Sequence, residues 1–269
     1  MVRRLLLFSV LFASLVLQAI PAMADILSSS SIEIDWSSRN VTLIDVPVPG
    51  GSPVFFEWIA GSGYGAVGLY AFTADPYDNQ SDSQSADDLT TLLSKDLTTA
   101  KAQASTLRDS VTLSASAASQ VDLGEAGSDN SADAWVENSV DFQFTGTGIV
   151  LITLDWKATL DGPLGDPSDV GRAAAYTFLQ AEYKNSSISN GYAFSNATMD
   201  SSEGQSGTWS GTLAVTMSNL ETDATTTGRL LSYVNAKTYS PNVVPEPASC
   251  VLMGLGFGLV GWISRRRWK

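Results

Sequence analysis

The chain of 269 residues contains no histidine and a single cysteine, Cys250. Histidine is the usual general base of catalytic triads and a principal ligand of protein zinc sites, so both kinds of site are excluded in their usual form. A lone cysteine cannot form a disulfide within the chain, and Cys250 has no histidine to pair with as a catalytic thiol. The sequence therefore predicts neither thiol catalysis nor a disulfide framework.

Basic residues are also scarce, with 15 Lys and Arg against 28 Asp and Glu. Six of the basic residues lie at the two ends of the chain, two before residue 5 and four within 264–269. The segment 25–239 is left with 27 acidic and nine basic residues, a net charge of −18. Such a charge argues against nucleic acid and against an anionic lipid surface as partners of this segment.

Residues 1–24 have the pattern of a secretory signal peptide. Two arginines precede an apolar run over 5–17, and the small residues Ala22 and Ala24 occupy the positions that signal peptidase recognises. A retained membrane helix is the alternative, but the apolar run is shorter than the roughly 20 residues that a span requires. We expect export by the general secretion machinery and a mature chain that begins near Asp25.

The segment 248–263 contains no charged residue. As a helix it would be about 24 Å long, somewhat less than the hydrocarbon core of a bilayer. A basic segment at 264–269 follows and predicts a stop-transfer signal that stays in the cytoplasm. Its cations are Arg265, Arg266, Arg267 and Lys269. The alternatives are an ordinary membrane anchor and a buried helix of a soluble domain, although such a helix would usually have a polar face.

The predicted linker 240–247 ends in Pro245, Glu246 and Pro247, just before the apolar segment. Two prolines fix φ and remove backbone donors, so the tripeptide is expected to be extended and accessible to a processing enzyme.

The chain end resembles the PEP-CTERM class of bacterial surface proteins. The resemblance rests on "VPEP", "ASCVLMGLGFGLVGWI" and "SRRRWK", which follow one another in this order. It implies recognition by an exosortase, a membrane enzyme thought to cleave near the Pro-Glu-Pro motif. It also implies a place in the cell envelope, at the cell surface or in an exopolysaccharide or biofilm matrix, with the tail helix as a transient or permanent anchor. It covers only the end of the chain and does not say what the outer domain binds.

Alternation of apolar and polar residues dominates the segment 25–239, for example over 32–36, 140–144 and 150–160. Such alternation is typical of antiparallel sheets with one face in a core and the other in water. Further strands are expected at 41–46, 53–60, 65–73, 110–118, 173–183, 208–217 and 229–239. The fold class predicted is mainly β, an antiparallel β-sandwich or jelly-roll-like domain.

Two local features are expected to interrupt this pattern. Apolar residues recur at three and four residues over about 87–107, which predicts one helix packed against the sandwich. The glycines of "TGTG" at 145–148 could supply the positive φ of a tight hairpin between the strands on either side.

Carboxylates are the only abundant groups with catalytic potential. A glycoside hydrolase needs two of them, and the candidates are Asp155, Asp161, Asp166, Asp169, Glu182 and Glu203. An acidic surface offers many such pairs by chance, so we expect no enzyme activity and keep a hydrolase as the weakest alternative.

No cofactor is expected, with calcium as the one alternative, because loop carboxylates are its natural ligands. The weak calcium candidates form two groups, Asp75, Asp78 and Asp82 in one and Asp161, Asp166 and Asp169 in the other. Neither group has the spacing of the twelve-residue calcium loop, so solvated side chains are the preferred interpretation.

Exposed tryptophans could stack on sugar rings. Trp36 and Trp156 share the apolar phase of their strands and are expected in the core. Trp135 and Trp209 lie beside Gly- and Ser-rich turns and are the candidates for a ligand surface. The preferred function is an exported structural protein of the cell surface or matrix. A carbohydrate-binding module is the alternative if Trp135 and Trp209 lie exposed on one face.

Overall fold

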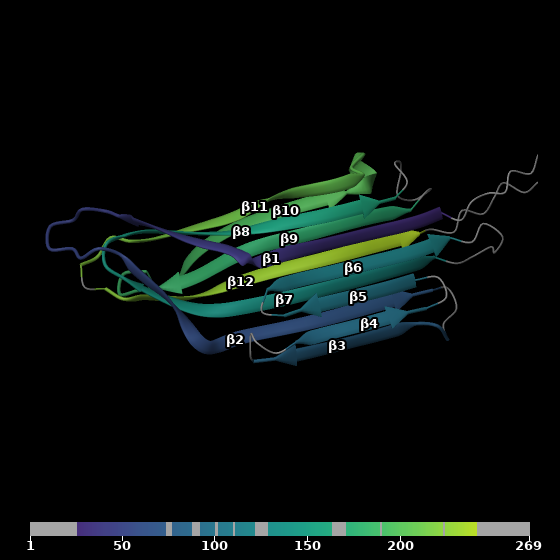
Figure 1. The fold of residues 1–269 in the computed structure, drawn as a ribbon, viewed down its shortest axis with the longest axis horizontal. Helices are drawn as coiled ribbons and strands as arrows, with labels where there is room; N and C mark the ends of the chain where they lie inside the picture. The colour runs from purple at the N-terminus through teal and green to yellow at the C-terminus, as the bar shows by residue number, and fades with distance from the viewer. Residues whose placement is uncertain are drawn as a thin grey trace, which may run out of the picture.

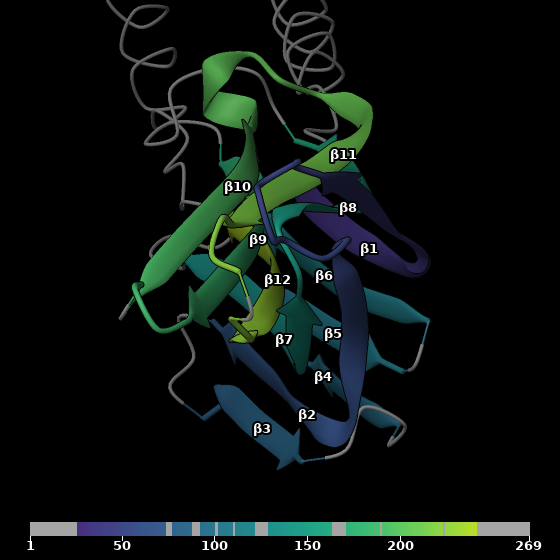
Figure 2. The same cartoon turned by 90° about the vertical axis from the view of Figure 1, so that its left-hand side faces the viewer.

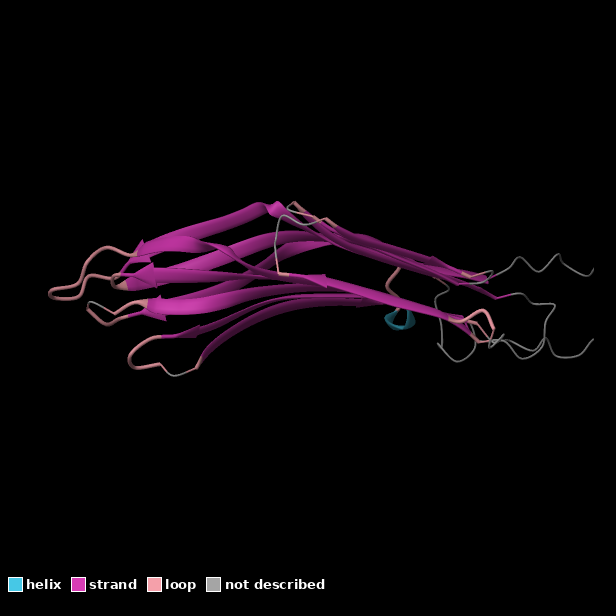
Figure 3. Cartoon of the chain, turned by 90° about the horizontal axis from the view of Figure 1, so that it is seen from below, coloured by secondary structure: helices cyan, strands magenta, loops and turns pink. Residues whose placement is uncertain are grey.

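A computed structural model describes residues 26–73, 77–87, 92–99, 102–109, 111–121, 129–162, 171–188, 190–222 and 224–240. Within these ranges the chain forms two antiparallel sheets of six strands each (Figures 1 and 3). The strands are β1 Ile26–Asp45, β2 Phe55–Phe72, β3 Gln80–Ala86, β4 Leu93–Thr98, β5 Ala102–Arg108, β6 Thr112–Val121, β7 Asn130–Thr145, β8 Gly148–Asp161, β9 Arg172–Lys184, β10 Gly191–Asp200, β11 Gly207–Asn219 and β12 Thr226–Ser240. A single 3₁₀ turn, η1 Ser201–Glu203, joins β10 to β11.

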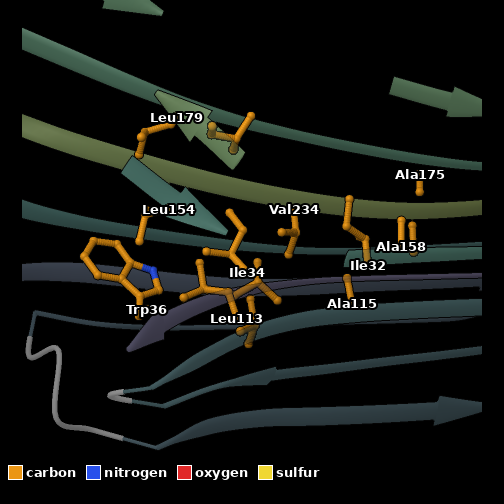
Figure 4. Close-up of a cluster of buried hydrophobic side chains, with 14 of the residues drawn as sticks. Ile32, Ile34, Trp36, Leu113, Ala115, Leu154, Ala158, Ala175, Leu179 and Val234 are labelled. Carbon is orange, nitrogen blue, oxygen red and sulfur yellow. The ribbon is translucent and has the colours of Figure 1, made fainter. Parts of the chain in front are cut away.

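Sheet A has the strand order β11-β8-β1-β6-β5-β4, and sheet B has the order β10-β9-β12-β7-β2-β3. The inward residues of both sheets form one hydrophobic core, in which Ile32, Ile34, Leu154 and Val234 are almost completely buried (Figure 4). Aliphatic and alanine side chains from both sheets, with phenylalanines from sheet B, fill the space between the two facing sheets. The predicted β-sandwich class is confirmed.

Bulges break the alternation in both long N-terminal strands. On β2, Trp58 pairs with Phe142 of β7, and the next pair is Gly63 with Val140. Between these two pairs β2 advances by three more residues than β7 does. An insertion of odd length exchanges the inward and outward faces of a strand. For this reason the sequence predicted two strands, 53–60 and 65–73, where the structure has one.

The equivalent bulge on β1 lies between Asp35 and Asn40. Its Arg39 guanidinium lies over the rings of Trp36 and Trp58, at 5.1 and 4.5 Å from their centroids. Burial lowers the pKa of Arg39. The cation–π contacts connect the two sheets at the point where both strands change phase.

The helix predicted over about 87–107 is wrong. Its described residues include β4 and β5, which pair with each other, and β5 also pairs with β6. Alternate residues of β5 are buried, including Ala102 and Ala104, whereas Leu107 of the expected helical stripe is only half-buried. Thr favours a strand, Ser is a weaker helix former than Ala or Leu, and β6 offers an edge with which β5 pairs. Tertiary pairing therefore overrides the helical spacing.

The hairpin expected at 145–148 is also wrong, although Gly146 does have a positive φ of 81°. β7 belongs to sheet B and β8 to sheet A, so the turn carries the chain from one sheet to the other. The loop before β2 closes this turn, since the amide of Thr147 donates to the carbonyl of Ser52 at 2.9 Å. A Cβ at Gly146 would overlap the carbonyl of Pro53, so close approach also requires this glycine.

Both ends of the described domain lie at one end of the sandwich, which we call the terminal end (Figure 1). Ile26 pairs with Val121, and the hydroxyls of Ser119 and Ser240 are 2.8 Å apart. The turn between β7 and β8 lies at the opposite end, which we call the far end and which faces the viewer in Figure 2. β8 runs between the two ends and is about 45 Å long at roughly 3.3 Å per residue.

Candidate functional site

The predicted sorting and processing residues lie outside the residues that the structure describes. They are Ala22, Ala24, Pro245, Glu246, Pro247, Arg265, Arg266, Arg267 and Lys269, together with the segments 1–24, 241–247 and 248–263. In the described ranges, no helix is long and apolar enough to span a membrane. The structure does locate Ser240, the last described residue, at the terminal end.

The two candidate tryptophans lie on different surfaces. Trp135 points outward from sheet B and is half-buried. Trp209 pairs with Ala158 and shares the phase of buried Leu213, so it points inward from the edge strand β11, where 41% of it remains exposed. They do not form the common surface on which the carbohydrate-binding alternative depended. Trp36 is buried and Trp156 packs partly buried against the core, as predicted.

Trp135 instead belongs to a cluster of aromatic side chains on the outer face of sheet B, which we call the aromatic belt. The belt consists of Trp135 on β7, Tyr233 on β12, Tyr176 and Phe178 on β9, and Tyr192 and Phe194 on β10.

Tyr233 lies at the centre of the belt. Its ring centroid is 5.1 Å from that of Phe178 and 6.3 Å from that of Trp135, and both pairs lie within 20° of parallel. Phe194 continues the belt at 5.5 Å from Phe178, and Tyr192 follows at 6.1 Å from Phe194 on the edge strand β10. Burial, followed by the charges of nearby carboxylates, raises the pKa of Tyr233 to about 12. The centre of the belt is thus partly shielded from water, while its β10 edge is open.

The belt depends on close contact with the backbone of β2. Gly68 pairs with Trp135, and a Cβ at Gly68 would lie 2.5 Å from the indole ring. The ring therefore occupies the space that any other residue at position 68 would fill.

The sequence contained a signal for the belt that was not used. In β9 the buried positions hold small residues such as Ala173, Ala175 and Ala181, while the outward positions hold Tyr176 and Phe178. An amphipathic strand usually has the opposite arrangement, with its large apolar side chains inward. Aromatic residues in the outward phase indicate a surface with a purpose other than core packing.

A groove of about 640 Å³ adjoins the belt near the far end, and we call it the far-end groove. Tyr192, Asp141, Glu182 and Arg229 are among its lining residues. Arg229 Nε donates to Asp141 Oδ1 at 2.8 Å, and these two charges with Glu182 belong to three adjacent strands. Gln180 connects the aromatic and charged parts, since it accepts from the Tyr192 hydroxyl at 3.3 Å and donates to Glu182 at 2.7 Å.

A second groove of about 540 Å³ lies on the same face near the terminal end, and we call it the terminal-end groove. Tyr70, Tyr239, Arg172, Lys237 and Asp133 contribute to its lining. Lys237 Nζ is 2.9 Å from the Asp133 carboxylate. The two grooves therefore combine aromatic rings with hydrogen-bonding and charged side chains, and the belt lies between them along the strands.

The carboxylate candidates are dispersed. Asp82 forms an ion pair with Lys95 at 2.7 Å, and Asp155 accepts from the Thr212 hydroxyl at 2.7 Å. Asp161 and Glu203 are exposed and Asp78 is half-buried, while Asp75, Asp166 and Asp169 lie outside the described residues. Among the residues described, no group of three or more Asp, Glu, His or Cys side chains is arranged to hold a metal ion. Of the hydrolase candidates, Glu182 is the one that lines a groove of the aromatic face.

Comparison with known proteins gives a result for the tail. No curated protein matches the chain. Residues 243–267 match the model of the PEP-CTERM protein-sorting motif, so the chain carries at its C-terminal end the sorting signal that its sequence predicts.

Proposed function

We propose that this exported, exosortase-sorted surface protein is a non-catalytic structural component of the extracellular matrix. The sorting motif at 243–267 is the observation that carries the proposal, because it directs the chain to the cell surface. The net charge of −18 over 25–239 supports a soluble role outside the cell and disfavours binding to nucleic acid.

The position of Ser240 supports a defined orientation of the domain. An extended chain advances at most about 3.6 Å per residue, so Pro245 lies within roughly 18 Å of Ser240. The terminal end is therefore the end beside the motif and the membrane, and the far end points away from the cell surface for as long as the tail is retained.

Carbohydrate binding is the second candidate function, and the aromatic belt favours it. Outward-facing tyrosine and tryptophan rings combine a flat apolar surface with a polar tip, which suits ligands that are apolar on one side and hydrogen-bonding on the other. The belt adjoins two grooves whose volumes are in the range usual for ligand sites.

The test of the proposed sorting is the intact mass of the protein from the envelope and medium of its native host. For the wild-type chain we expect a species that begins near Asp25 and ends near Pro245 to Pro247. Replacing Pro245, Glu246 and Pro247 together by alanine should leave export intact and yield a species that retains Lys269. Pro241→Ala combined with Asn242→Ala, just before the matched residues, is the control and should be processed as the wild type is. Identical mature masses for the wild type and the motif variant would contradict the assignment.

A further inference from the structure

The two outer faces of the sandwich differ in composition, although both contact solvent. The outward residues of sheet A are mainly Ser and Thr with a few charges, among them Ser31, Ser114, Ser116, Thr159, Thr208 and Lys157. Of the described outward positions of sheet A, none is aromatic. The outward positions of sheet B carry the aromatic belt and, on β2, Tyr70 and Phe72, whose rings are 6.2 Å apart. Strand propensity acts equally on both sheets and does not explain this difference.

The aromatic face is accessible at its edges and continuous along the strands. Tyr192 is 61% exposed, and Phe194 and Tyr70 are each 44% exposed. Arg229 lines the far-end groove and Lys237 the terminal-end groove, so the grooves are about 26 Å apart along β12 at roughly 3.3 Å per residue. A ligand that contacts both grooves and the belt must therefore be an extended chain rather than one small molecule.

The charges on this face select against an anionic ligand. Three of the four cations on its described residues are paired with a carboxylate: Arg229 with Asp141, Lys237 with Asp133, and Arg172 with Asp200. The fourth, Lys184, is exposed at the end of β9 and lines the far-end groove. Two further outward carboxylates, Glu137 and Glu182, give the face a net negative charge. Burial raises the pKa of Glu137, as expected for a carboxylate beside the rings of the belt. A uronic acid polymer that extends over the belt and both grooves would meet a net negative face with Lys184 at one end as the one unpaired cation among the described residues of this face, and a second copy of this acidic domain would be repelled.

We infer that the outer face of sheet B binds a neutral polysaccharide chain that lies along β7 and β12 across the aromatic belt. The inference deepens the carbohydrate-binding alternative proposed above and assigns its site. The C–H faces of sugar rings are apolar and would pack on the aromatic rings, while the sugar hydroxyls would bond to side chains in the grooves. Glu182 in the far-end groove, Gln180 bonded to it, and Asp133 in the terminal-end groove supply such partners. In this arrangement one protein connects the cell surface to the matrix glycan.

The test is affinity electrophoresis of the purified full chain in detergent, through gels that contain one polysaccharide each. The probes are the neutral exopolysaccharide of the native host, taken as the fraction that does not bind an anion exchanger, then galactomannan, mixed-linkage β-glucan and, as the anionic probe, alginate. We expect retardation by the host's neutral fraction or by a neutral probe, and none by alginate. Tyr192→Ala combined with Phe194→Ala should weaken binding by about tenfold or more, since two exposed stacking rings are lost.

The matched control replaces Thr159 and Thr208, whose hydroxyls are 3.1 Å apart on the outer face of sheet A, by alanine. This variant should bind as the wild type does, and unchanged melting temperatures should show that both variants fold. Retardation by alginate alone, no retardation by any neutral polysaccharide, or equal binding by the belt variant and the wild type would each overturn the inference. Because the assay uses the unprocessed chain, none of these results bears on the sorting assignment, which the mature mass tests separately.

Discussion

At the scale of single residues, the guanidinium of Arg108 is a tightly packed charged group in the described core. The side chain extends from β5 into the core, where Nε and Nη2 donate to Asn138 Oδ1 at 3.1 and 2.9 Å. It lies directly against β2, since a Cβ at Gly65 would be 2.0 Å from the guanidinium carbon. A buried charge tolerates little displacement, because moving it breaks hydrogen bonds that nothing else in the core replaces.

We therefore expect Gly65→Ala to lower the free energy of unfolding by about 2 kcal/mol or more, in the upper range for overpacked cores. Urea denaturation of the wild type and the variant measures this difference. The control is the same substitution in an Arg108→Met background, where the flexible Met side chain can move aside. In that background Gly65→Ala should lower the free energy of unfolding by less than about 1 kcal/mol. The difference between the costs in the two backgrounds is the coupling energy between positions 65 and 108. Equal costs in both backgrounds would show that the guanidinium is not what Gly65 accommodates.

At the scale of elements, the β10–β11 connection depends on one carboxylate. Asp200 accepts from the amide and hydroxyl of Ser202 at 2.9 and 2.7 Å, which caps η1, and from Arg172 Nε at 3.0 Å. Gly204 ends the turn with a φ of 78°. Burial acts to raise the pKa of Asp200, but the bonds from Arg172 and Ser202 outweigh it and lower the pKa below 3.8. The carboxylate therefore contributes stability above pH 4, and this contribution is lost as the pH falls through the lowered pKa.

Asp200→Asn keeps the capping oxygen and removes the charge. At pH 7 we expect it to lower the free energy of unfolding by about 1.5–3 kcal/mol, the range for hydrogen bonds to a charged group. The difference from the wild type should narrow as the pH falls from 7 to 3, because the wild-type carboxylate becomes protonated. Urea denaturation at a series of pH values measures this. Asp161→Asn, at an exposed carboxylate of β8, is the control and should show no comparable pH-dependent difference. A difference for Asp200→Asn that is constant with pH would contradict the role of the charge.

Elements are also the scale at which sequence reasoning succeeded and failed. Alternation identified strands that bury one face in the core, as with Ile32 and Ile34 of β1. It did not identify β3 or β10, whose residues are mostly exposed or half-buried. It could not identify continuous strands across the bulges, since an odd insertion reverses the pattern. Local spacing predicted a helix at 87–107 and a hairpin at 145–148, and both predictions were wrong. The residues of these segments do not reveal that β6 has an edge available for pairing, nor that β8 belongs to a different sheet from β7. For the candidate surface, Trp135 was found and its neighbours were not, because cross-strand neighbours depend on register.

At the scale of the whole molecule, the shared position of Ile26 and Ser240 determines which end of the domain is connected to the tail. The terminal end is within roughly 18 Å of the sorting motif, and the far end is about 45 Å beyond it. Because Cys250 is the only cysteine, Cys250→Ala gives a cysteine-free chain in which single probes can be placed. Asp161→Cys marks the terminal end and Ser52→Cys the far end, both at exposed positions.

The full chain is reconstituted in liposomes that contain nitroxide-headgroup lipids. We expect these lipids to quench a fluorophore attached to the Asp161→Cys variant. A fluorophore attached to the Ser52→Cys variant should keep its intensity. Contact quenching needs close approach, and only the terminal end is held near the headgroups by its short connection to the tail. A chain cut after Ser240 is the control, since it lacks the tail and should show no quenching at either site. Equal quenching of both sites in the full chain would mean that the domain lies flat on the membrane. Such a result would contradict the proposed orientation, in which the far end points away from the membrane.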